Sequence, residues 1–177
     1  MIKISPRRVY RLLHPKLTVI VSAQSGDKKN AMTVAWITPV SANPPLIVIA
    51  VAPKRFTHKL IEESKEFIVN IPDINKLELV NYMGTVSGRD VDKLAKVKYR
   101  EGVKVKAPVL EDCVAWLECK VVNQVEAGDH TLFMGKVVKA YAREGVFDEI
   151  YNIEEFKPVF HLGGDNYTTV EKKIYKP

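Results

Sequence analysis

Residues 30–70 have the sequence NAMTVAWITPVSANPPLIVIAVAPKRFTHKLIEESKEFIVN, and this stretch decides the fold. Its apolar runs are rich in Val, Ile and Thr, which is typical of β-strands. The predicted strands lie at 31–37, 46–52 and 66–71. Between the second and third strand, apolar residues recur at helical spacing over 56–65. The stretch therefore predicts three strands with one short helix placed before the last of them.

The helix predicted at 56–65 follows directly after two cationic residues, Lys54 and Arg55. Thr57 is a candidate to cap its first turn, and free backbone N–H groups at a helix N-terminus attract anions. A guanidinium fork beside them suits phosphate oxygens. This turn is a candidate phosphate site, and the alternative is that both cations are solvated loop charges.

The strand pattern continues through the rest of the chain. Further strands are predicted at 17–23, 114–125, 131–142 and 159–162, and further helices at 74–82 and 90–94. Regular short strands favour a barrel or a sandwich, and no helix is long enough for a helical bundle. Because the run at 46–52 is apolar on both faces, we expect it at the centre of the sheet. The predicted class is mostly β with short α: a closed β-barrel flanked by short helices.

Length and composition indicate a single domain over residues 1–177, because 177 residues suffice for one well-filled hydrophobic core but are too few for two domains with separate cores. The net charge of +6 suggests an anionic partner, either a nucleotide cofactor, nucleic acid or a membrane surface. One local basic run consists of Lys93, Lys96, Lys98, Arg100, Lys104 and Lys106. It lacks interleaved aromatic residues, so we interpret it as a solvated basic loop and expect no nucleic-acid partner.

Cys113 and Cys119 are the two cysteines, at the start of and within the strand predicted over 114–125. Six residues along a strand span about 20 Å, which is beyond the reach of a disulfide. We expect reduced thiols in a reducing compartment, and therefore a cytoplasmic protein. The apolar run at 17–23 is far shorter than the roughly 20 residues that a membrane helix needs, so no membrane association is expected.

Two further motifs carry polar groups. The loop GTVSGRD at 84–90 could donate N–H and O–H groups to an anion, although it lacks the Lys-Ser/Thr ending of a P-loop. His130 follows a Gly-Asp turn at the start of a strand, where it could act near a ligand or close the turn. The four histidines never approach metal-ligand spacing, so no metal site is expected. No Gly-x-Ser-x-Gly elbow occurs, which argues against a covalent hydrolase.

Seven motifs occur in order along most of the chain: NAMTVAW, TPVSANPPLI, APKRFTH, EFIVNIP, GTVSGRDVDK, GDHTLFMGKV and HLGGDNYTT. Together they resemble the flavin reductase-like family, which includes the flavoredoxins. The resemblance implies the FMN-binding split barrel, arranged as a homodimer with the flavin near the subunit interface. It implies FMN as cofactor, with FAD as an alternative.

The resemblance also implies a set of cofactor-binding residues. Those in the first motif that follow the isoalloxazine ring are Met32, Thr33, Val34 and Ala35, and Asn30 of the same motif is a further cofactor-binding residue. Those that hold the phosphate are Ser41, Lys54, Arg55 and Thr57, with Ser87 and Gly88 approaching the same cofactor. His130 resembles a histidine near the flavin or nicotinamide, where it would have a positioning role, and Tyr167 resembles a late aromatic at the same pocket. A strand edge suits the flavin because its alternating donors and acceptors match the pyrimidine rim.

The function implied is hydride or electron transfer through FMN, most simply as a flavin or ferric reductase that uses NADH or NADPH. One alternative is a flavoredoxin-type FMN carrier without its own nicotinamide site, which a redox partner protein reduces. A remote alternative, from charge alone, is a basic nucleic-acid-binding β-barrel. No Rossmann glycine motif is present that would separate the first two.

Overall fold

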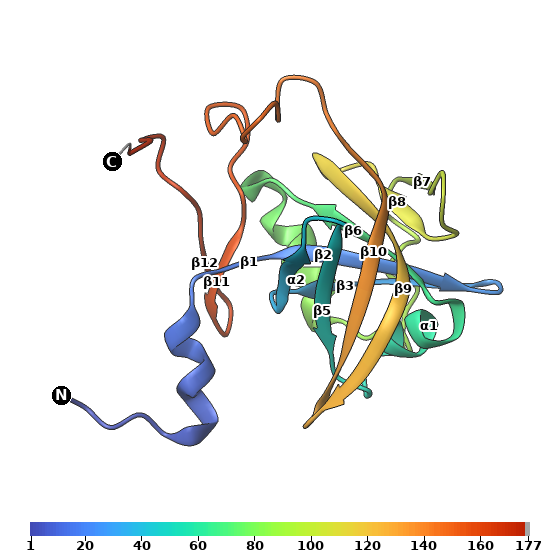
Figure 1. The fold of residues 1–177 in the computed structure, drawn as a ribbon, viewed down its shortest axis with the longest axis horizontal. Helices are drawn as coiled ribbons and strands as arrows, with labels where there is room; N and C mark the ends of the chain where they lie inside the picture. Colours follow the sequence, from blue (N-terminus) through green and yellow to red (C-terminus); the bar gives the residue numbers. More distant parts are fainter. Residues whose placement is uncertain (176–177) are drawn as a thin grey trace.

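The computed structural model describes residues 1–175, and its main element is one antiparallel seven-stranded sheet in the order β3-β2-β6-β9-β10-β5-β4 (Figure 1). The strands of this sheet are β2 (Val19–Ser25), β3 (Lys28–Val34), β4 (Ile37–Ser41), β5 (Leu46–Val51), β6 (Glu66–Ile71), β9 (Ala115–Ala127) and β10 (His130–Ala142). The outer strands β3 and β4 are not paired with each other among the described residues. The sheet is therefore open, which confirms the split barrel that the family resemblance implies, whereas the closed barrel expected from the strand pattern alone is wrong.

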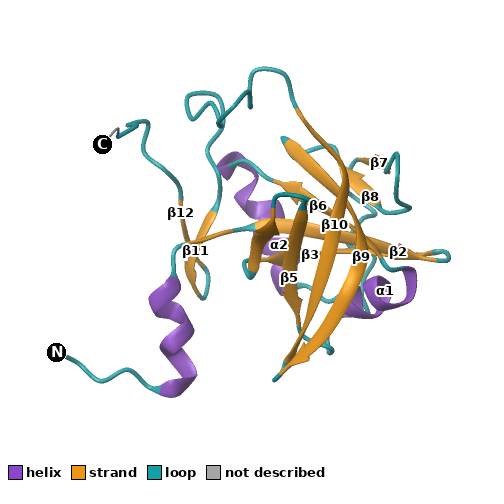
Figure 2. Ribbon diagram, viewed as in Figure 1, coloured by secondary structure: helices purple, strands orange, loops and turns teal. Residues whose placement is uncertain are grey.

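Short elements complete the fold (Figure 2). The helices are η1 (Pro6–Leu13), α1 (Phe56–Ser64), η2 (Ile74–Lys76) and α2 (Leu77–Thr85). The strands β1 (Lys16–Leu17), β11 (Phe160–Gly163) and β12 (Asn166–Thr168) form a small sheet, and β7 (Tyr99–Glu101) pairs with β8 (Pro108–Leu110). Mostly β with short helices is thus confirmed as the fold class.

Two sequence expectations about elements are wrong. Residues 90–94 form turns rather than a helix, because the Asp92 side chain accepts the backbone N–H of Leu94 and so competes with helical hydrogen bonding. Strand β5 lies between β10 and β4, near one edge of the sheet, and only its alternate residues are buried. An apolar run therefore does not by itself place a strand at the centre.

The strands buried on both faces are β2 and β6. In β6, Phe67 and Val69 pack in one hydrophobic cluster, while Ile68 between them packs in a second cluster on the other face. Helix α2 contributes Val80 and Met83 to the second cluster, so it covers that face of the sheet. Helix α2 also contacts the neighbouring strand β3, and the site described below lies beside this contact.

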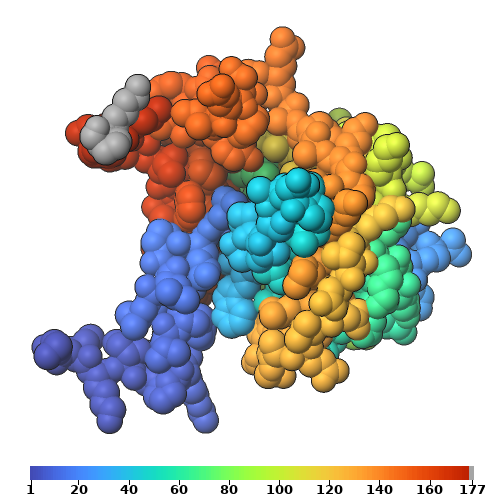
Figure 3. Space-filling model, in the orientation of Figure 1, coloured from blue at the N-terminus to red at the C-terminus, as the bar shows by residue number. Residues whose placement is uncertain are grey.

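The N-terminal and C-terminal segments meet beside the sheet. Strand β1 pairs with β11, which joins the N-terminal segment to the C-terminal hairpin β11–β12. Helix η1 has no buried residue and projects away from the body, as the space-filling view shows (Figure 3). These terminal segments form one wall of the main cavity.

Both cysteines are buried and unpaired, which confirms the expectation of free thiols. Burial raises the pKa of Cys113 and of Cys119 to about 12, so neither is a reactive thiolate. Over residues 1–175, no helix has the length and apolarity required to cross a membrane.

Candidate functional site

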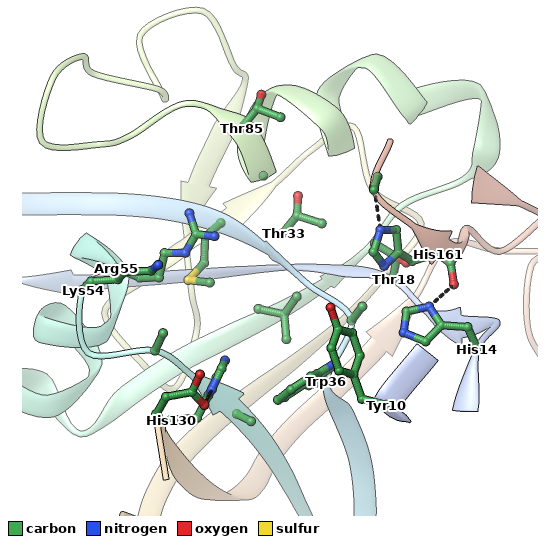
Figure 4. Close-up of a pocket in the computed structure, with 18 of the residues that line it drawn as sticks. Tyr10, His14, Thr18, Thr33, Trp36, Lys54, Arg55, Thr85, His130 and His161 are labelled. Carbon is green, nitrogen blue, oxygen red and sulfur yellow. Dashed lines mark hydrogen bonds and ion pairs between the residues drawn. The ribbon is translucent and has the colours of Figure 1, made fainter. Parts of the chain in front are cut away.

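A cavity of about 610 Å³ lies between strand β3, the start of β10 and the terminal segments (Figure 4). Its lining includes Met32, Thr33, Val34, Ala35, Trp36, Lys54, Arg55, His130 and Tyr167. A second cavity of about 170 Å³, the inner cavity, shares five of its residues with this main cavity. The remaining residues of the inner cavity include Asn30, Thr57, Ser87, Gly88 and Lys93. The two cavities are therefore contiguous and together form a slot with a pocket at one end.

The slot is bordered by the free edge of β3. Within residues 1–175 this strand pairs only with β2, so alternate N–H and C=O groups along its outer edge remain available for a ligand. The side chains behave differently: Val34 is buried in the core, and the Thr33 hydroxyl donates to the Val80 carbonyl of α2. At these positions the backbone, rather than the side chain, is the group that a ligand could use.

Asn30 and Thr57 form the floor of the inner cavity. Both side chains are buried, and Asn30 Nδ2 donates a hydrogen bond of 2.9 Å to Thr57 Oγ1. The sequence analysis named Thr57 as a candidate cap of α1, and this prediction is wrong. Arg55 occupies the N-cap position, and its side chain makes no capping hydrogen bond. Gly88 touches this floor, because a Cβ built there would lie 2.3 Å from Asn30 Oδ1. Only glycine fits at that position without displacing Asn30.

Lys93 is a residue of this site that sequence reasoning missed, because it was interpreted as part of a solvated loop. Its exposed fraction is only 3%, and its ammonium donates a 2.9 Å hydrogen bond to the Met83 carbonyl near the end of α2. Burial, helped by the charge of Arg55, lowers the pKa of Lys93 to about 8. Lys93 of the basic run is therefore buried and lines the same cavity as Lys54 and Arg55 at the start of α1.

His130 lies at the opposite side of the main cavity from α2. Its Nδ1–H donates to Asp129 Oδ1 over 2.6 Å, and this bond lowers the pKa of Asp129. The imidazole packs on Trp36, with ring centroids 4.7 Å apart and an interplanar angle of 31°. Tyr10 packs edge-on against the same Trp36 ring. Nδ1 is thus engaged and Nε2 is the ring nitrogen left for a ligand.

The terminal segments supply a second group of rings. His14 Nδ1 bonds to the His161 carbonyl at 2.9 Å, and His161 Nε2 bonds to the Gly164 carbonyl at 2.7 Å (Figure 4). Because carbonyls only accept, each bonded nitrogen carries the proton. The ring centroids of Tyr167 and His161 lie 5.3 Å apart, and burial raises the pKa of the Tyr167 hydroxyl. Sequence reasoning placed Tyr167 at the pocket but missed both histidines.

The structure brings together nearly all of the residues expected at the site. Ser41 is the exception: it lies on β4, pairs with Leu46 and lines neither cavity. Trp36 was missed although it ends the motif NAMTVAW, and His161 was missed although it begins HLGGDNYTT. No local signal pointed to His14, because only the pairing of β1 with β11 places it at the cavity.

The donor set fits a planar ring with an anionic tail. Three cations, Lys54, Arg55 and Lys93, converge on the inner cavity, and no acidic residue lines it. The buried ammonium of Lys93 has no carboxylate within 4.0 Å among residues 1–175, so an anion would compensate it. The slot beside β3 offers a strand edge and the rings of Trp36 and His130.

Comparisons with known proteins agree with this geometry. The family model of the flavin reductase like domain matches residues 10–161. An uncharacterised protein of Archaeoglobus fulgidus is 38% identical over 168 residues, which cover 93% of this chain and 94% of that protein.

Two solved structures extend the likeness to nearly the whole fold. The flavoredoxin of Methanosarcina acetivorans has a TM-score of 0.89 and 29% identity, covering 99% of this chain and 94% of the other. An FMN-binding protein from Thermus thermophilus, solved with bound 1-cyclohex-2-enone, has a TM-score of 0.88 and 27% identity, covering 100% and 98%. The chain therefore belongs to the flavin reductase-like family.

Proposed function

We propose that this protein binds FMN and transfers hydride from NADH or NADPH to it, as a flavin or ferric reductase. The observation that carries the proposal is that the two cavities are contiguous. The inner cavity is cationic, and the main cavity runs beside the free edge of β3. When bound, FMN supplies the redox chemistry, accepting a hydride and passing electrons onward. The similarity to FMN-binding proteins and flavoredoxins supports this choice of cofactor.

The chain's own contribution is binding and orientation. Lys54, Arg55 and Lys93 would hold the phosphate, and the backbone of residues 32–35 would meet the pyrimidine rim of the ring. Trp36 and the terminal segments line the slot, and with a ring bound between them they would limit the access of water, which strengthens electrostatic interactions inside. His130 Nε2 would position the reacting rings or stabilise negative charge that develops on reduction.

The test is anaerobic mixing of the FMN-loaded protein with NADH and, separately, with NADPH. Rapid bleaching of the oxidised flavin absorption supports a reductase and identifies the donor. Persistent oxidised flavin favours the second candidate, an electron carrier that a partner protein reduces, which the similarity to a flavoredoxin suggests. If the protein reconstituted with FMN shows neither flavin absorption bands nor a shifted thermal midpoint, both candidates are wrong.

His130→Ala is expected to slow flavin reduction about tenfold, less than the roughly hundredfold or more that a proton-transferring side chain contributes, because His130 positions the rings and does not transfer a proton. FMN affinity should change little, since the phosphate contacts lie at the other end of the slot. Stopped-flow reduction and flavin titration measure the two effects. Asp129→Asn, which alters the partner of Nδ1, should give part of the same rate loss. Loss of flavin from the alanine variant would instead make His130 a cofactor contact.

A homodimer is part of the proposal, and the N-terminal helix supports it. Helix η1 exposes Leu12 and Leu13 to 69% and 68%, and it lacks the packing that normally holds so long a 3₁₀ helix. A second copy could supply this packing. Leu12→Glu combined with Leu13→Glu should convert a dimer into a 20.0 kDa monomer, as measured by light scattering after size-exclusion chromatography. The matched pair Val122→Glu and Val125→Glu, on exposed positions of β9, should leave the dimer intact, and a monomeric parent protein would refute the proposal.

A further inference from the structure

Two surfaces of opposite charge border the main cavity. Under the proposed function the inner cavity holds the phosphate of FMN, so the adenosine half of a nicotinamide dinucleotide, with its negative charges, has to extend elsewhere. One path runs past His130, towards the turn between β9 and β10. The other runs past His14 and His161 of the terminal segments, on the side of the cavity away from Arg55 (Figure 4).

The surface beyond His130 is acidic. A cavity of about 540 Å³ there shares His130 with the main cavity. Three carboxylates line it, those of Glu62, Glu63 and Glu126. Its lining also holds the cations Lys59 and Arg89, but Lys59 is paired with Glu63 over 3.6 Å. The phosphates of a dinucleotide would meet negative charge on this side, which disfavours the path past His130.

The terminal side is basic. Helix η1 carries Arg7, Arg8 and Arg11, and within residues 1–175 none of the three has a carboxylate within 4.0 Å. Arg11 lies against strand β11, because its guanidinium carbon is 3.6 Å from the place that a Cβ on Gly163 would take. The next residue, Gly164, lines the main cavity. The guanidinium of Arg11 therefore stands at the rim of this cavity.

An aromatic ring holds Arg11 at this rim. The guanidinium carbon lies 6.0 Å from the centre of the Tyr10 ring, in a cation–π arrangement. Tyr10 itself lines the main cavity and packs edge-on against Trp36. The carboxylate of Asp165 belongs to the same wall of the cavity, but it lies more than 4.0 Å from Arg11. The guanidinium is thus available to an anion that extends out of the cavity.

NADPH differs from NADH by one group, a phosphate monoester on the 2′ oxygen of the adenosine ribose. This group carries nearly two negative charges and has three terminal oxygens. A guanidinium binds such a phosphate through two parallel hydrogen bonds. NADH has only a hydroxyl at this place, for which a carboxylate is the usual partner. A cationic rim therefore favours NADPH.

We propose that the protein takes NADPH in preference to NADH, with Arg11 of η1 binding the 2′-phosphate at the rim of the main cavity. This inference rests on the proposed function and names the electron donor that the function leaves open. It gives Arg11 a role separate from that of Leu12 and Leu13, the exposed residues of the same helix.

The first measurement is kcat/KM for anaerobic flavin reduction by each nucleotide, in the parent protein, Arg11→Gln and Lys28→Gln. Lys28→Gln is the matched control, because Lys28 is exposed at the turn between β2 and β3 and lines neither the main nor the inner cavity. The parent and the control should favour NADPH at least about tenfold, the effect of one hydrogen bond to a charged group. Arg11→Gln should lose most of this preference through a lower kcat/KM for NADPH.

The second measurement does not involve reduction. Adenosine 2′,5′-bisphosphate carries the 2′-phosphate and AMP lacks it, and calorimetric titration measures the binding of each to the FMN-loaded protein. The bisphosphate should bind the parent and Lys28→Gln at least about tenfold more tightly than Arg11→Gln. AMP should bind all three proteins alike.

Equal reduction of the parent by NADH and NADPH would overturn this inference alone. It is also overturned if Arg11→Gln weakens the bisphosphate and AMP by the same factor, because the contact would then not involve the 2′-phosphate. Reduction by neither nucleotide would refute the proposed reductase, and this inference with it, and that result is distinct from equal reduction by both.

Discussion

Replacing Lys54 and Arg55 together by alanine is expected to weaken FMN binding about a hundredfold. The two side chains lie at the cationic end of the slot, where the phosphate is proposed to bind, at the step from β5 into α1 (Figure 4). Each would form a charge-assisted contact worth roughly 1.5 kcal/mol, the lower end of the range because both residues are exposed. Together this is about 3 kcal/mol, which corresponds to a hundredfold change in the dissociation constant. Fluorescence titration with FMN measures it.

The control for this experiment removes the same net charge elsewhere. Lys96 and Lys98 are exposed residues of the nearby loop that line neither cavity, so their double alanine variant should bind FMN like the parent. Equal losses in both variants would mean that the overall positive charge of the protein, and not these contacts, attracts the cofactor. An unchanged dissociation constant in the Lys54/Arg55 variant would place the phosphate elsewhere.

Glu118→Ala is expected to lower the free energy of unfolding by about 3 kcal/mol. The Glu118 carboxylate on β9 is fully buried and accepts the backbone N–H groups of Val103, Lys104 and Val105, and also the Tyr141 hydroxyl. Removing the acceptor leaves several donors without a partner, at about 1 to 3 kcal/mol for each one that water cannot reach. The figure is kept at the lower end because three of these four bonds are only partly buried.

Urea unfolding at equilibrium measures this loss through the shift of the midpoint. Glu126→Ala, at an exposed position of the same strand, is the matched control and should change stability by less than about 0.5 kcal/mol. Glu118→Gln retains one acceptor oxygen and should lie between the two. If Glu118→Ala unfolds at the midpoint of the parent, the loop at 103–105 does not depend on the carboxylate.

The same carboxylate should make stability depend on pH. Burial acts to raise the pKa of Glu118, but the hydrogen bonds outweigh it, and the pKa in the folded protein is lowered below the ordinary value of 4.5. A group whose pKa is lower in the folded than in the unfolded protein stabilises the fold. This stabilisation is fully present above the pKa of the unfolded state and is lost as the pH falls through the pKa of the folded state. The stability difference between the parent and Glu118→Gln should therefore shrink below about pH 4.5.

Local patterns predicted much of the fold. The bounds of β6 were predicted to the residue, and the helix at 56–65 differs from α1 by one residue. The closed barrel and the central position of β5 were wrong, because closure and strand order depend on pairings between distant segments. An apolar run reports that a strand is partly buried, but it does not name its neighbours.

The site divides in the same way. Lys54, Arg55 and the motif at 30–36 stand close together in the sequence and carried their own signals, whereas Ser41, from the same stretch, lies away from both cavities. Lys93 looked like one of six solvated cations, and only its packing beside α2 and Arg55 distinguishes it.

The sequence by itself determined the strand-rich class, the cationic turn before α1 and, through its ordered motifs, the family. The tertiary structure alone decided that the sheet is open at β3, that Lys93 is buried beside the inner cavity, and that His14 and His161 line the slot. The physical reason is the range of the interactions. Strand and helix patterns arise between residues a few positions apart, while burial and the convergence of charges arise from contacts between segments that only folding brings together.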